Sequence, residues 1–261
     1  MKEKLNQVDL CFVVDTTGSM NPFINAAREA LLETISTLCK RDGVDLQIGL
    51  VEYRDHPPQE RSFVTKHHAL VSDLKKMEKI INNLYASGGG DHPEAVYDGV
   101  CEAAVLTDWR EHSQRFIMLV GDAPPQGYNV RRESRRACTC GLDIAKVTAA
   151  AEEKRALVHA LPMANDAATI GAFTEIARGT GGACAETTNA NSIVKRIEEM
   201  LDREFCNLQF DGEVLEVASE FSNLEAGAIS QKLECSRLQV AASIAHLRRR
   251  GFLSEILKTR R

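Results

Sequence analysis

The chain has 261 residues, of which 44% are hydrophobic and 26% are charged, and its formal net charge is −5 at pH 7. This is the composition of a globular protein, long enough for one large domain or for a medium domain with a smaller one. It excludes a membrane span, because no run approaches the roughly 18 to 20 apolar residues that a span needs. The first residues also lack the apolar segment of a signal peptide, so we expect a cytoplasmic protein without membrane contact.

From the N-terminus to about residue 205, strand-like and helix-like patterns alternate along the chain. Segment 61–70 is more polar than the other strand-like segments, which favours the edge of a sheet. Alternation of this kind predicts an α/β fold with a doubly wound, mainly parallel sheet of six strands in a domain at 1–205. The six strand-like segments lie near residues 8–14, 45–53, 61–70, 115–120, 156–162 and 183–187.

Polar residues follow the carboxyl ends of several predicted strands, which is where open α/β sheets bind their ligands. One loop follows residues 8–14, a glycine loop lies at 87–94, and a third follows residues 115–120. Their carboxylates and hydroxyls suit Mg²⁺, with Mn²⁺ or Ca²⁺ as alternatives, and argue against Zn²⁺, which prefers Cys and His. A purely structural alternative for the first loop is a turn whose Ser, Thr or Asp caps the N-terminus of the following helix. The predicted metal ligands are Asp15, Thr17, Ser19, Asp91 and Asp122.

Three motifs together resemble a von Willebrand factor A (VWA) domain over roughly residues 5–205. They are Asp-x-Thr-x-Ser at 15–19, Gly-Gly-Gly-Asp-x-Pro-Glu at 88–94 and Gly-Asp-Ala-Pro-Pro at 121–125. The reading Asp-Thr-Thr-Gly-Ser-Met at 15–20 is similar to the intracellular bacterial and lower-eukaryotic branch of that family. The resemblance implies a metal-ion-dependent adhesion site (MIDAS), in which hydroxyls bind the cation directly, aspartates often act through water, and an acidic group of a partner protein completes the coordination.

Asp91 departs from the better-known adhesion domains, which carry a Thr at the matching position. A third carboxylate beside one dication predicts tighter metal binding and a weaker demand for an acidic partner group. Unchanged metal and partner affinity in Asp91→Thr would show that Asp91 is not a ligand. We expect Arg54 and Asp55, after the second strand, to orient the metal loops or to pair with each other.

The sequence gives little support for enzymatic activity or for a metal site built from cysteine thiolates. The glycine run at 88–90 is not followed by the Lys-Ser/Thr of a P-loop, and no Ser or Cys nucleophile stands in a recognisable motif, so we predict no enzymatic activity. Cys138 and Cys140 form the only close pair of cysteines. They lack a second pair or a His at zinc spacing, so we expect an incidental pair, with a metal or redox role as the alternative.

Residues 206–261 depart from the alternating pattern. Helical segments near 211–221, 224–233 and 237–250, followed by a strand-like segment at 252–257, resemble a winged helix-turn-helix. In DNA-binding members of that class the third helix enters the major groove. The segment is nearly neutral, which favours protein docking or packing on the first domain over nucleic acid. The predicted nucleic-acid contacts are Arg237, Gln239, Arg248, Arg249 and Arg250.

Two functions follow from these patterns. The leading hypothesis is a non-enzymatic protein-binding module that recruits an acidic partner through a divalent cation and acts as a scaffold in an intracellular complex. The alternative is a transcription-type regulator, in which the first domain senses a partner and the helix-turn-helix binds DNA.

Overall fold

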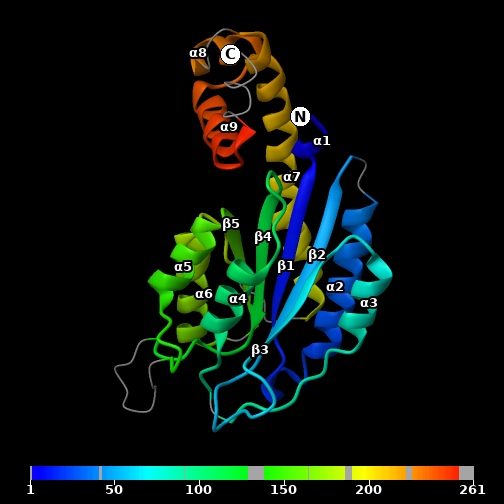
Figure 1. Ribbon diagram of the computed structural model, residues 1–261, viewed down its shortest axis with the longest axis vertical. Helices are drawn as coiled ribbons and strands as arrows, with labels where there is room; N and C mark the ends of the chain where they lie inside the picture. The colour runs from blue at the N-terminus through cyan, green and yellow to red at the C-terminus, as the bar shows by residue number, and fades with distance from the viewer. Residues whose placement is uncertain are drawn as a thin grey trace.

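The computed structural model describes residues 2–40, 43–90, 92–128, 138–163, 165–185, 190–221 and 225–252. Within them, a five-stranded sheet has the order β3-β2-β1-β4-β5 (Figure 1). Three of the four pairings are parallel, and β3 pairs antiparallel to β2 at the edge. This confirms the α/β class and the edge position of the polar strand. The strands are β1 (Gln7–Asp15), β2 (Asp45–Tyr53), β3 (Thr65–Val71), β4 (Gln114–Gly121) and β5 (Ala156–Pro162).

The sixth predicted strand, near 183–187, is not part of this sheet in the described chain. Cys184 forms only an isolated parallel bridge with Ala160 of β5. Residues 186–189 lie outside the described residues. The described sheet therefore has five strands where the sequence predicted six.

Helices cover both faces of the sheet, because alternate residues of each central strand point to opposite sides. In β1, Phe12 and Val14 join the core beneath α2, α3 and α7, while Cys11 and Val13 join the core beneath α4, α5 and α6. Both cores are fully apolar at these positions, as expected for a parallel sheet covered on two sides. The helices are α1 (Lys2–Leu5), α2 (Ile24–Cys39), α3 (Leu74–Asn82), α4 (Val96–Leu106), α5 (Ile144–Glu153), α6 (Ala167–Gly179), α7 (Ala190–Glu220), α8 (Ala226–Lys232) and α9 (Arg237–Arg249).

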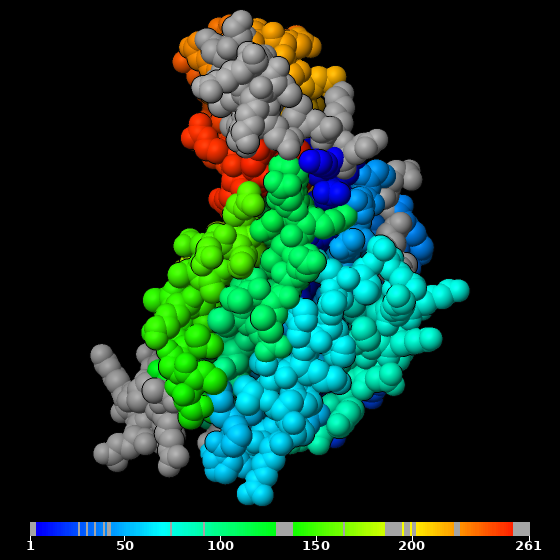
Figure 2. All heavy atoms as spheres, viewed as in Figure 1, coloured from blue at the N-terminus to red at the C-terminus, as the bar shows by residue number. Residues whose placement is uncertain are grey.

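The long helix α7 joins the sheet domain to the C-terminal helices. Its residues Phe205 and Leu208 belong to the core against the sheet, whereas Val214 and Val217 belong to a separate core with α8 and α9. The boundary predicted between 205 and 206 therefore lies inside one continuous helix. Figure 2 shows the orange and red atoms of α8 and α9 at one end of the molecule. The carboxyl ends of β1 and β4 point to the opposite end (Figure 1). The predicted strand at 252–257 lies outside the described residues, except for Phe252.

His159 of β5 is a buried histidine that holds the segment after α6. Its ring packs on Phe116, and its Nδ1 accepts a hydrogen bond of 3.2 Å from the Ala183 amide. Its Nε2 is buried and meets no hydrogen-bond partner among the described residues. Burial first, and then the charge of Arg203, lower the pKa of His159 from 6.5 to about 4.

We expect His159 to make the fold sensitive to acid. Because the unfolded chain binds this proton at a higher pH than the folded chain, stability declines as the pH falls from 6.5 towards 4, by up to about 3 kcal/mol. In urea titrations across this range, His159→Asn, which keeps an acceptor but cannot titrate, should lose less stability than the wild type. Parallel pH profiles for the two proteins would contradict this role.

Candidate metal centre

Three loops meet at the carboxyl edge of the sheet, where β1 lies between β2 and β4. The Gly18 amide of the first loop donates to the Gly88 carbonyl of the glycine loop at 2.9 Å. The Glu94 amide, at the end of the glycine loop, donates to the Pro124 carbonyl of the loop after β4 at 3.0 Å. Backbone hydrogen bonds thus hold the three loops together, and the edge has the order reversal at which such sheets bind ligands.

Four of the five predicted ligands form one continuous chain of polar contacts. Asp15 Oδ1 accepts from the Thr17 amide at 2.8 Å and from the Thr17 hydroxyl at 2.6 Å. The Thr17 and Ser19 hydroxyls are 3.1 Å apart, and Ser19 Oγ donates to Asp122 Oδ1 at 2.9 Å. The structure therefore brings together Asp15, Thr17, Ser19 and Asp122 from two loops that lie more than 100 residues apart in the sequence.

Burial and charge at this cluster fit a cation. Asp15 is fully buried, and its second oxygen, Oδ2, meets no hydrogen-bond partner among the described residues. Burial, and then the negative charge of Asp122, raise the pKa of Asp15 to about 7, and burial raises the pKa of Asp122 as well. A buried carboxylate whose charge is disfavoured by its surroundings, beside a second carboxylate and two hydroxyl oxygens, forms the oxygen donor set that a hard dication prefers.

The glycine loop requires glycine where it passes the first loop. Gly88 and Gly89 have φ values of +74° and +75°, in the region that side chains disfavour. A Cβ on Gly88 would lie 1.6 Å from Glu60 Oε2, and one on Gly89 would lie 3.2 Å from Thr17 Cβ. The loop can therefore run directly against the metal turn. Asp91, the fifth predicted ligand, lies outside the described residues.

Arg54 and Asp55 both touch the loops that they were predicted to orient. Arg54 is buried, and its Nε donates to Thr16 Oγ1 at 3.4 Å, next to the metal turn. Its Nη1 donates to Ser62 Oγ at 2.9 Å. Asp55 Oδ1 accepts from the His56 amide at 2.6 Å and from the side chain of Gln126, in the loop after β4. The two side chains thus fasten the segment after β2 to the first and third loops.

The C-terminal candidates for nucleic-acid contact have different environments. Arg237, Arg248 and Arg249 are exposed on α9. Gln239 is exposed too, but its side chain accepts from Ser236 in the capping box of the helix. Arg250 is only 3% exposed, and its guanidinium donates to the backbone carbonyls of the sheet domain. Arg250 is therefore not placed to bind phosphate, which corrects its predicted role.

Sequence reasoning missed a second cluster, which lies beside the segment that follows β2 and is formed by His56, Asp98, Cys138 and Cys140. The Cys-x-Cys spacing was a visible signal, but its His and Asp partners lie 40 or more residues away. Only the fold shows that they meet.

Among the described residues, no helix combines the length and the apolar character needed to cross a bilayer.

Comparisons with known proteins agree with this fold. Alpha-protein kinase vwkA of Dictyostelium discoideum is 29% identical over 121 residues, covering 46% of this chain and 19% of that protein. An ariadne-like RING finger protein of Acanthamoeba polyphaga mimivirus is 32% identical over 127 residues, covering 49% of this chain and 12% of that protein. The chain thus matches less than a fifth of the length of either relative.

A solved structure and a family model complete the comparison. Proximal thread matrix protein 1 of the mussel byssus, solved with zinc in its MIDAS motif, superposes with a TM-score of 0.56 at 15% identity, covering 77% of this chain and 46% of that one. At this identity the similarity shows the fold alone. The model of the von Willebrand factor A domain matches residues 9–189, well over half of the chain. The chain therefore belongs to the von Willebrand factor A domain family.

Proposed function

We propose that this chain is a protein-binding module whose grip on its partner depends on a divalent cation held by Asp15, Thr17, Ser19 and Asp122. The observation that carries the proposal is the buried Oδ2 of Asp15, which has no hydrogen-bond partner within the described part of the chain and lies beside two hydroxyls and a second carboxylate. Ser19 is exposed, so the cluster opens to solvent where a partner can reach it. A bound cation would supply positive charge for an acidic group of that partner.

The four proposed ligands differ in their burial. Asp15 and Thr17 form the buried base of the metal site and are hydrogen-bonded to each other. Ser19 and the half-buried Asp122 form the mouth. Mg²⁺ is our choice of ion because the donors are all oxygens, with Mn²⁺ or Ca²⁺ as alternatives. The mussel protein holds zinc in its own MIDAS motif, so identifying the ion requires measurement.

We further propose that the module acts without catalysis, as a recruiter or scaffold in an intracellular complex. The kinase and RING finger names of the two relatives do not argue against this, because the similarity covers less than a fifth of each. The seven cysteines whose side chains the structure describes are free thiols, which fits the reducing cytoplasm. The sequence of the first loop, Asp-Thr-Thr-Gly-Ser-Met at 15–20, resembles that of the intracellular branch of the family.

Partner capture from lysate tests this function. We expect the wild type to retain a partner in Mg²⁺ and to lose it in EDTA, and Ser19→Ala to lose it in Mg²⁺. Ser72→Ala, an exposed serine before α3, is the matched control and should bind like the wild type. The partner, once identified, should lose its affinity when one acidic residue is changed to its amide. Retention that is equal in EDTA and in Ser19→Ala would refute a metal-dependent interface.

DNA binding remains the second candidate, supported by the exposed Arg237, Arg248 and Arg249 on α9. Helix α9 lies at the end of the molecule away from the metal loops (Figure 1), so DNA binding should be indifferent to EDTA. If these side chains contact phosphates, affinity should fall steeply with salt, and each substitution by alanine should lower the slope of log affinity against log salt by about 0.9. A flat salt dependence would exclude this function.

A further inference from the structure

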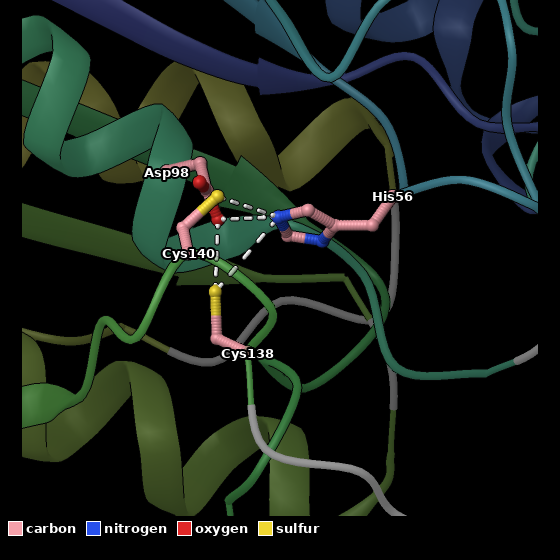
Figure 3. Close-up of side chains that lie close together, drawn as sticks. All are labelled: His56, Asp98, Cys138 and Cys140. Atoms are coloured by element: carbon pink, nitrogen blue, oxygen red, sulfur yellow. Dashed lines mark hydrogen bonds and ion pairs between the residues drawn. The ribbon is translucent and has the colours of Figure 1, made fainter.

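Four side chains with metal-binding atoms converge beside the segment that follows β2 (Figure 3). His56 belongs to that segment, Asp98 lies in the first turn of α4, and Cys138 and Cys140 lie in the turn before α5. Three parts of the chain, distant in sequence, thus supply one imidazole, one carboxylate and two thiols. None of these atoms belongs to the oxygen cluster around Asp15.

Four of the six separations among these atoms are close to those of a tetrahedral zinc site. His56 Nε2 lies 3.2 Å from Asp98 Oδ2, 3.2 Å from Cys140 Sγ and 3.8 Å from Cys138 Sγ. Cys138 Sγ lies 3.3 Å from Asp98 Oδ2. Zinc bonds of about 2.0 to 2.3 Å place the ligands of a tetrahedron about 3.3 to 3.8 Å from one another. All four atoms lie within 4.8 Å of one another, so small adjustments would close the shell.

The polar contacts of this cluster converge on Asp98. Its Oδ2 accepts from the Cys138 thiol at 3.3 Å and lies 3.2 Å from His56 Nε2, while His56 Nε2, which carries at most one hydrogen, also lies beside both sulfur atoms. The other ring nitrogen, Nδ1, is buried without a hydrogen-bond partner among the described residues, and it lies 4.0 Å from Asp55 Oδ1. Asp55 is therefore near, but not yet in, the hydrogen-bonded position from which a carboxylate supports a zinc-binding imidazole. A cation among the four atoms would use every one of them.

Burial distinguishes this cluster from a chance surface grouping. The side chain of His56 is 4% exposed and that of Asp98 is 11% exposed, and Cys138 is buried as well. Only Cys140 is exposed. Three of the four candidate ligands are therefore shielded from water.

We propose that His56, Asp98, Cys138 and Cys140 hold one structural Zn²⁺. Two thiolates and an imidazole select zinc over Mg²⁺ or Ca²⁺, and four protein ligands leave no open position for catalysis. Both thiols give up their protons when the metal binds. The site fastens the turn before α5 to α4 and to the Arg54–His56 segment, whose Arg54 touches Thr16 of the metal turn. The zinc proposal does not depend on whether the oxygen cluster around Asp15 binds a partner.

Metal analysis of the full chain, reduced and passed through a column to remove loose ions, tests the proposal. We expect about one tightly held zinc per chain in the wild type and in Asp15→Ala, which removes the oxygen site. Cys138→Ser/Cys140→Ser should lose that equivalent. Cys206→Ser, an exposed thiol of α7, is the matched control and should keep it. Zinc that is lost in Asp15→Ala and kept in the double variant would place the ion in the oxygen cluster and overturn the proposal.

Spectroscopy of the wild type makes the test independent of whether the double variant folds. With Co²⁺ in place of zinc, we expect a thiolate-to-cobalt charge-transfer band and the intense ligand-field bands of four-coordination. X-ray absorption of the zinc protein should show a shell of two sulfur and two lighter atoms. A shell of oxygen and nitrogen alone, or a Cys138–Cys140 disulfide in metal-free protein that takes up no zinc after reduction, would refute the site.

Discussion

Replacing Arg250 by alanine is expected to lower the free energy of unfolding by about 3 kcal/mol, although the residue lies in a run of arginines. Its Nε and Nη2 donate to the His112 carbonyl at 3.1 and 2.9 Å, and Nη2 also donates to the Leu5 carbonyl at 2.8 Å. In return, the Arg250 carbonyl lies 3.1 Å from His112 Nδ1. Alanine would leave two buried carbonyls without their charged donor and would weaken the attachment of α9 to the sheet domain.

Urea denaturation measures this effect, and Arg248→Ala provides the matched control. Arg248 is exposed two residues earlier in the same helix, so its removal should change stability by no more than about 0.5 kcal/mol. Arg250→Lys keeps the charge but loses the planar fork, and its stability should lie between the two. If the two alanine variants were equally stable, the contacts of Arg250 with the sheet domain would contribute nothing to folding.

The environment of Arg250 could have been predicted from helical spacing. Val240, Ile244 and Leu247 mark the apolar stripe of α9, and all three are buried. Position 250 follows Leu247 by three residues and therefore continues the same face. The composition of the arginine run suggested phosphate contact for all of its members. The periodicity separates Arg250, which is buried, from Arg248 and Arg249, which are exposed.

The fold and most of the oxygen site were predictable because their signals are local. The strand signals of β1 and β4 are continuous apolar runs, and the polar residues after them must share one edge of a parallel sheet. Asp15, Thr17 and Ser19 lie within one turn, and Asp122 is placed by the end of β4. No comparable rule joins His56 to Cys138, since their meeting depends on the path of two loops. The sixth strand, near 183–187, is not confirmed: its described part pairs with β5 at Cys184, and the rest lies outside the described residues.

Asp15→Asn is expected to remove most of the response of the protein to Mg²⁺ without harming the metal-free fold. Loss of this carboxylate should lower Mg²⁺ affinity on the order of 100-fold, the upper end of the losses seen when a group that supports a metal is removed. At a Mg²⁺ concentration of about 100 times the wild-type dissociation constant, the wild type gains about 2.7 kcal/mol of stability, and the variant should gain only about 0.4 kcal/mol. Calorimetric titration with Mg²⁺ measures the affinity, and thermal unfolding in Mg²⁺ and in EDTA measures the gain.

The metal-free comparison decides between a ligand and a turn residue. Among the residues that the structure describes, the buried Oδ2 atom of Asp15 has no hydrogen-bond partner and lies beside a second carboxylate, so in EDTA the amide should be at least as stable as the acid. Asp73, whose side chain accepts from the Lys75 amide at 3.0 Å, shows the other behaviour, because it caps α3. Asp73→Ala should cost about 1 kcal/mol equally in Mg²⁺ and in EDTA. If Asp15→Asn instead lost several kcal/mol in both conditions, the role of Asp15 would be to stabilise the turn after β1. It would then not be a metal ligand.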